Sequence, residues 1–124
     1  NPIPEIDPKL AMQAGAKVFG TARADLPNQI NNVLGFPGIF RGALMVRARQ
    51  INERMKLSAS HALAGVVLES ELNENFVVPL AFDRRVVPSV ATAVAEAAIS
   101  SGEARVKKTK SEMHQELRSL GLAD

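Results

Sequence analysis

The chain has 124 residues and a mass of 13.3 kDa, which suits a single domain, and it contains no apolar run near the about 20 residues that a membrane-spanning helix needs. The absence of cysteine excludes disulfides, thiolate metal sites and cysteine nucleophiles, and it fits the reducing cytoplasm, where we expect the protein. A net charge of only +2 predicts no strong field for nucleic acid.

The first residues predict a chain that leaves a structure preceding them. The Asn-Pro-Ile-Pro sequence of residues 1–4 cannot be helical, because each proline fixes its own φ and favours an extended conformation in the residue before it. There is no initiating methionine and no signal-peptide pattern, so we expect the sequence to begin inside a longer one. Asp7 and Pro8 are typical of an N-cap followed by a first helical proline, and they predict a short helix that Gly15 ends.

The next segment predicts half of a parallel βαβ unit. Residues 16–20 form an apolar run short enough for a buried strand, and ligands of such units generally bind at the carboxyl ends of the strands. Four side-chain amides follow that end: Asn28, Gln29, Asn31 and Asn32. Amides offer hydrogen-bond donors and an acceptor without charge, which suits a hydroxyl, carboxylate or carboxamide ligand. The alternative is that they only cap helices and shape turns.

Four helices, a loop and an extended segment are predicted after the amides. Residues from 37 to about 50 and from about 52 to 67 have apolar side chains at helical spacing, and they predict two amphipathic helices. Residues 69–75 predict a polar loop, and the proline in residues 76–82 predicts an extended segment. Asp83 is expected to N-cap the next helix, which ends at residues 100–102, and a short helix is expected near residues 112–120.

Three motifs favour ordinary structural roles. Gly35, Gly38 and Gly42 are not followed by the Gly-Lys-Ser/Thr of a phosphate loop, so we interpret them as turn glycines and as sites of close helix packing. His61 and His114 lack a surrounding pattern of metal ligands. The basic residues between 105 and 110 leave open a small binding module for anions, but the chain has no Trp or Tyr to stack on bases.

Three blocks of the sequence resemble the C-terminal part of the NAD(P)-dependent malic enzymes. They are Asn-Pro-Ile-Pro-Glu-Ile at residues 1–6, the amide run with its Phe-Pro-Gly-Ile-Phe-Arg-Gly-Ala-Leu continuation at 27–44, and Ile-Asn-Glu-Arg-Met-Lys-Leu at 51–57. The resemblance implies a helix-rich α/β fold. Residues 1–103 would be the C-terminal part of a Rossmann-type NAD(P)-binding domain with its following helices, and residues 104–124 a charged tail with a short helix.

The resemblance implies oxidation of malate by NAD or NADP, followed by loss of carbon dioxide while a divalent cation, Mg or Mn, polarises the carbonyl oxygen of the keto acid. It places Asn31 on the substrate, and Asn1 beside both the malate and the nicotinamide. The family's catalytic lysine and tyrosine, its metal-binding carboxylates and the residues that select NAD or NADP lie upstream of the matched region. We therefore expect the segment alone to be inactive, with malate, the upstream part of the enzyme and identical subunits as its partners.

Four positions depart from the pattern of the family. Ala22 and Ala24 stand where malic enzymes usually have glycine and serine, Met45 stands where an aspartate is common, and Arg54 where a glutamate is common. Alanine at position 22 would resist a left-handed backbone conformation that glycine adopts freely. These departures leave an alternative open, in which the chain is a non-catalytic structural or oligomerisation fragment of the family.

Overall fold

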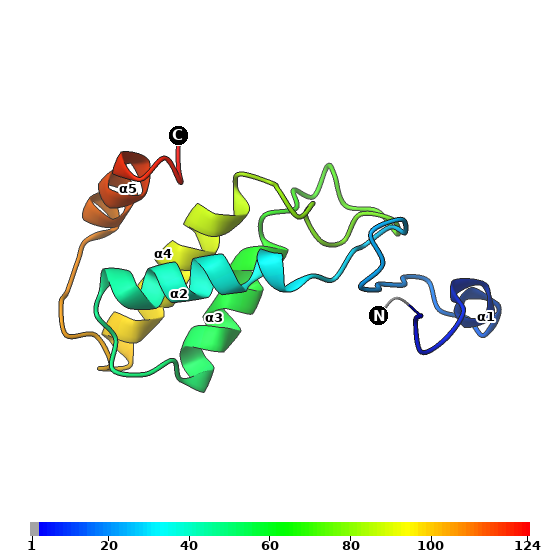
Figure 1. Ribbon diagram of the computed structural model, residues 1–124, viewed down its shortest axis with the longest axis horizontal. Helices are drawn as coiled ribbons and strands as arrows, with labels where there is room; N and C mark the ends of the chain where they lie inside the picture. Colours follow the sequence, from blue (N-terminus) through cyan, green and yellow to red (C-terminus); the bar gives the residue numbers. More distant parts are fainter. Residues whose placement is uncertain (1–2) are drawn as a thin grey trace.

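The computed structural model describes residues 3–124, in which a three-helix bundle carries a long N-terminal arm and a C-terminal helix (Figure 1). The helix α4 contacts α2, α3 and α5, so it forms the centre of the packed part. The arm with α1 extends away from the bundle, at the right in Figure 1. The elements are α1 (Pro8–Gln13), the 3-10 helix η1 (Asn32–Leu34), α2 (Phe36–Met45), α3 (Glu53–Ala64), α4 (Val86–Ser100) and α5 (Lys110–Ser119).

The starts of α1 and α3 confirm the capping signals in the sequence. The Asp7 side chain accepts a hydrogen bond of 2.8 Å from the backbone amide of Lys9, and Gly15 follows the helix with a φ of +102°. The Asn52 side chain accepts a bond of 3.0 Å from the amide of Met55 and begins α3. Each cap satisfies a backbone amide that the helix itself leaves without a partner.

The α2 helix ends earlier than its sequence predicts, at residue 45 instead of about residue 50. Arg47 has a left-handed φ of +51°, and the amide of Ala48 donates back to the Ala43 carbonyl at 2.8 Å. The amide of Arg49 then donates to the carbonyl of Glu103 at 3.0 Å. The backbone therefore leaves the helix to pair with the segment after α4, a contact that helical periodicity does not show.

The last two helices also begin differently from the expectation. Asp83 is not the N-cap of α4, because Arg85 occupies that position and the Asp83 carboxylate instead accepts from the Arg85 amide at 2.9 Å. The α5 helix begins at residue 110 with a capping box, in which Thr109 and Glu112 each accept a bond from the other's backbone amide. The bonds from Thr109 hold the pKa of Glu112 below its usual value.

The predicted strand over residues 16–20 is absent, and no β-strand forms anywhere in residues 3–124. Two isolated bridges occur, a parallel one between Thr21 and Gln29 and an antiparallel one between Asn73 and Phe76. A strand of a parallel sheet needs neighbouring strands that come from distant parts of a chain. The described residues are therefore helix-rich, and they do not by themselves make the expected α/β sheet.

The core lies where α2 and α3 pack on α4. Val90 and Val94 of α4 are fully buried. A Cβ atom on Gly38 would lie 2.6 Å from the Val90 Cβ, and one on Gly42 would lie 2.8 Å from the Val94 Cβ, so both glycines allow the close approach of α2 to α4. This confirms the packing interpretation of these two glycines. None of the helices within residues 3–124 has the length and apolar character required to cross a membrane.

Candidate functional site

The amide run lies between the arm and the bundle, where its backbone is paired with the end of the 16–20 segment. The amide of Ile30 donates to the Thr21 carbonyl at 2.8 Å, and the Thr21 amide donates to the Asn28 carbonyl at 3.3 Å. These two bonds surround the parallel bridge between Thr21 and Gln29. The run then enters η1 and α2, so the backbone of the site is fixed at both ends.

Asn31 is exposed and occupies the position immediately before η1. Its Oδ1 accepts a hydrogen bond of 3.0 Å from the amide of Val33, which fixes the orientation of the side-chain carboxamide. Its Nδ2 donates to no group among residues 3–124. The Asn31 side chain thus fits both interpretations of the amide run. Its Oδ1 caps a helix, and its Nδ2, which has no partner among residues 3–124, has N–H donors available for a ligand.

An open hollow of about 630 Å³ lies beside Asn31. Within it, Arg23 Nε donates to Asp25 Oδ1 at 2.8 Å, and this pairing lowers the pKa of the Asp25 carboxyl. The carboxamide of Gln29 donates weakly to the Ala22 carbonyl at 3.4 Å. The hollow is lined by Ile3, Ala22, Arg23, Ala24, Asp25, Gln29 and Asn31. A neutral ion pair and two amides suit a small polar or carboxylate ligand that is held by hydrogen bonds.

Asn28 has a different environment from its neighbours in the run. It is 6% exposed, has a left-handed φ of +54°, and its side chain bonds to the backbone of two other segments. The sequence grouped the four amides together, and the structure separates them, because Gln29 and Asn31 line the hollow whereas Asn28 is buried and does not line it. Asn1, the other expected site residue, lies outside the described residues.

The structure shows how the chain accommodates two of the departures from the family pattern, Ala22 and Met45. Ala22 is not among the non-glycine residues with positive φ, so the alanine at this position imposes no left-handed strain. Met45 is 3% exposed and belongs to the core around α4, so burial of an apolar side chain replaces whatever polar contact an aspartate would make. Neither position disturbs the local backbone of the site.

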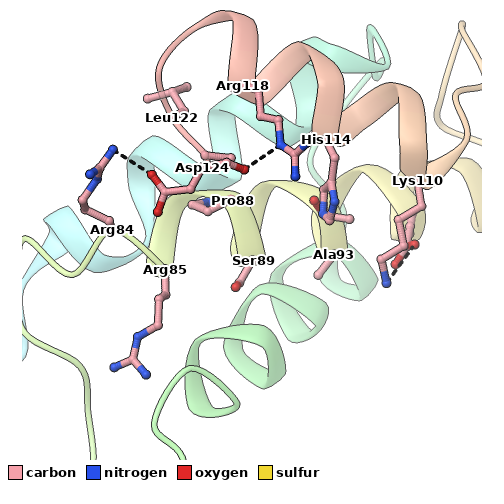
Figure 2. A pocket seen from close by; sticks show the side chains of 13 residues that line it. Arg84, Arg85, Pro88, Ser89, Ala93, Lys110, His114, Arg118, Leu122 and Asp124 are labelled. Atoms are coloured by element: carbon pink, nitrogen blue, oxygen red, sulfur yellow. Dashed lines mark hydrogen bonds and ion pairs between the residues drawn. The ribbon is translucent and has the colours of Figure 1, made fainter.

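The groove between α4 and α5 has a volume of about 540 Å³ and several basic side chains, some of which bond to acceptors in its own lining (Figure 2). Arg84 pairs with the Asp124 carboxylate at 3.0 Å, and Arg118 Nε donates to the Asp124 backbone oxygen at 2.5 Å. Lys110 lies 3.9 Å from Glu96. Among the basic residues between 105 and 110, Lys110 alone lines this groove, so the groove does not decide the interpretation as a basic binding module.

The described residues contain few candidates for metal ligands. No group of three or more His, Cys, Asp or Glu side chains within residues 3–124 could hold a metal ion. His61 is exposed on α3, and His114 lines the groove between α4 and α5.

Comparison with known proteins identifies the family. The model of the malic enzyme NAD-binding domain matches residues 16–99. The chain is 55% identical over 120 residues to the bifunctional malic/malolactic enzyme of Bacillus subtilis, covering 97% of this chain and 29% of that protein. It is 60% identical over 105 residues to the NAD-dependent malic enzyme of Geobacillus stearothermophilus, covering 85% of this chain and 22% of that protein.

A solved structure gives the same assignment. The malic enzyme from Pyrococcus horikoshii matches with a TM-score of 0.88 and 46% identity, over 98% of this chain and 27% of that one. The chain thus spans less than a third of the length of these relatives. It belongs to the malic enzyme family and represents a segment that includes part of the NAD-binding domain.

Proposed function

We propose that this segment forms one wall of the malate site in an enzyme that oxidatively decarboxylates malate to pyruvate and carbon dioxide with reduction of NAD or NADP. Membership of the malic enzyme family supports the activity, and relatives named as NAD-dependent and NADP-dependent enzymes support either cofactor. The observation that supports the site is the Asn31 carboxamide beside an open hollow: its Oδ1 accepts a hydrogen bond, and its Nδ2 has no partner among residues 3–124.

The role of Asn31 in this proposal is to bind and orient the substrate. Its free N–H groups donate to a carboxylate or to the hydroxyl of malate, and the bond from the Val33 amide prevents rotation of the carboxamide. Asn1 is proposed to lie on the opposite side of the substrate, near the nicotinamide. The cofactor accepts the hydride and the cation polarises the keto oxygen, and the residues that bind both are proposed to come from the remainder of the enzyme.

The same remainder is proposed to complete the fold. The parallel bridge between Thr21 and Gln29 supports an extended path through residues 16–20, which would join a Rossmann-type sheet when the other strands are present. A homo-oligomer in the cytoplasm is the assembly and location that we infer from the family.

The test replaces Asn31 in the complete enzyme. Asn31→Ala should lower kcat/KM for malate roughly 5- to 150-fold, because the substrate then loses its hydrogen-bond donor. This factor corresponds to about 1–3 kcal/mol of lost transition-state stabilisation. Asn31→Asp retains an oxygen that can accept from the Val33 amide but has no N–H groups, so it should lose at least as much activity while η1 stays capped. Steady-state kinetics with malate and thermal unfolding of each variant measure both effects.

Asn32→Ala is the matched control, because Asn32 is an exposed amide in the same run with no side-chain bond to residues 3–124. Its kcat/KM for malate should stay near that of the parent enzyme. If both Asn31 variants use malate as well as the parent, Asn31 does not contact the substrate. If the complete parent chain itself fails to oxidise malate, the non-catalytic structural alternative is the better description.

A further inference from the structure

Asn28 combines a costly backbone conformation with nearly complete burial. Its φ of +54° lies in the left-handed region, which is unfavourable for a residue with a Cβ atom and where asparagine is among the few tolerated residues. Only 6% of the residue is exposed. Such a residue persists in the fold only where its surroundings compensate for the strain.

The compensation comes from the carboxamide, which bonds to backbone groups in two separate segments. Nδ2 donates to the Phe19 carbonyl at 3.1 Å and to the Glu74 carbonyl at 2.9 Å, and Oδ1 accepts from the Val77 amide at 2.8 Å. Both donors and the acceptor are therefore used. Phe19 lies at the end of the 16–20 segment, whereas Glu74 lies in the polar loop between α3 and α4 and Val77 lies just after it.

This arrangement connects the polar loop to the residues that bear the proposed substrate ligand. Asn28 and Asn31 are separated by two residues, and the bond from the Ile30 amide to the Thr21 carbonyl keeps the short connection extended. A shift of Asn28 would therefore move the backbone of Asn31. Because a hydrogen-bond donor must lie within a few tenths of an ångström of its place to act on a ligand, such a shift would weaken substrate binding.

We propose that Asn28 is a positioning residue for malate, which holds Asn31 in place by tying residues 74–77 to the amide run. The proposal rests on the proposed function, in which Asn31 contacts the substrate. Asn28 itself does not line the hollow beside Asn31, so its effect on malate passes through Asn31. Residues 74–77 thereby help to hold the site in place, although they lie more than forty residues after Asn28 in the sequence.

The test uses Asn28→Gly in the complete enzyme, because glycine accepts the left-handed backbone but lacks all three side-chain bonds. At a temperature well below unfolding, the KM for malate should rise by about tenfold, as expected for a ligand displaced by a fraction of an ångström. The KM for NAD(P) should stay unchanged. A merely structural role would lower the thermal midpoint and the yield of active enzyme without changing the KM for malate, and that result would overturn the proposal.

Asn28→Asp provides a second variant in case the glycine variant does not fold. The carboxylate retains the acceptor for the Val77 amide and the preference for left-handed backbone, but it faces two carbonyl oxygens without a donor. The same rise in the KM for malate is expected. Asn73→Ala is the matched control, because Asn73 is exposed in the same loop and its side chain bonds only to Glu71 and Asn75 nearby. The control should keep the parent KM.

A double-mutant cycle with Asn31→Ala separates this proposal from the proposed function. If Asn28 acts through Asn31, the effect of Asn28→Gly on kcat/KM for malate should largely disappear in the Asn31→Ala background. Additive effects of the two substitutions would overturn the positioning role while leaving Asn31 as a ligand. A normal malate response of Asn31→Ala alone would refute the proposed site itself.

Discussion

Thr92 and Asn28 are the two buried polar residues in the described part of the chain, and they differ in how their polar atoms are satisfied. The Asn28 carboxamide is fully bonded, whereas the Thr92 hydroxyl on α4 is buried without a hydrogen-bond partner in residues 3–124. A buried hydroxyl without a partner costs about 1–3 kcal/mol. The unpaired Thr92 hydroxyl therefore lowers the stability of the core relative to an apolar side chain of the same shape.

Replacing Thr92 with valine should stabilise the enzyme. Thr92→Val keeps the branched shape of the side chain and removes the unpaired hydroxyl, so we expect the free energy of unfolding to rise by about 1 kcal/mol. Thr109→Val is the matched control, because it removes the N-cap of α5 and should lower stability by about 1 kcal/mol. Denaturant unfolding measures both changes. A loss of stability in Thr92→Val would show that the hydroxyl has a partner in the complete enzyme.

The residues of the candidate site were only partly predictable from the sequence. The chemistry of amides pointed to the run that contains Asn31, and the resemblance to malic enzymes selected Asn31 within it. The role of Asn28 was not predictable, because its partners Glu74 and Val77 are distant in the sequence and are reached through a loop without regular structure. The only local signal was an asparagine after Pro27, in a run where left-handed conformations are tolerated.

At the scale of elements, the contact between α2 and α4 depends on glycines that face the partner helix. A Cβ on Gly42 would meet the Ala91 carbonyl and lie 2.8 Å from the Val94 Cβ. Alanine normally stabilises a helix by about 1 kcal/mol relative to glycine, but here the clash dominates. We expect Gly42→Ala to lower the free energy of unfolding by about 1–3 kcal/mol, as measured by denaturant unfolding.

Gly65→Ala is the control for that substitution. Gly65 caps α3 with an ordinary right-handed φ of −73°, and the nearest atoms to a Cβ there would lie 3.5 Å away. Its effect on stability should stay within about 0.5 kcal/mol. Equal effects of the two substitutions would mean that α2 and α4 separate readily, and that close glycine packing does not stabilise the bundle.

The starts of α1 and α3 were predictable, because their capping signals are local. The caps at Asp7 and Asn52 lie within three residues of the amides that they satisfy. Two other errors arose where distant segments decide the structure. The end of α2 is set by pairing of Arg49 with Glu103, and the absent strand over residues 16–20 requires neighbours that residues 3–124 do not provide.

At the scale of the whole molecule, one face of α2 has no packing partner within residues 3–124. Phe36, Phe40 and Leu44 follow at helical spacing and are 52%, 53% and 69% exposed, with the two phenyl rings 5.9 Å apart. The opposite face of the helix packs on α4. A continuous apolar stripe of this kind usually marks an interface, whereas single exposed apolar residues are common on any surface.

The remainder of the same polypeptide is the expected partner of this stripe, because the chain spans only 22–29% of the relatives compared above. Cysteine labelling of the complete enzyme tests this expectation, and this segment contributes no cysteine of its own. Leu44→Cys should react with a thiol reagent at least about tenfold more slowly than Ser60→Cys, a position exposed on α3, as located by mass spectrometry. Equal rates would show that the stripe stays open to solvent in the complete enzyme. Slow labelling of Leu44→Cys that becomes fast when the enzyme is unfolded would instead place the α2 stripe in an internal interface. Burial by the remainder of the polypeptide would then explain why this helix face is so apolar.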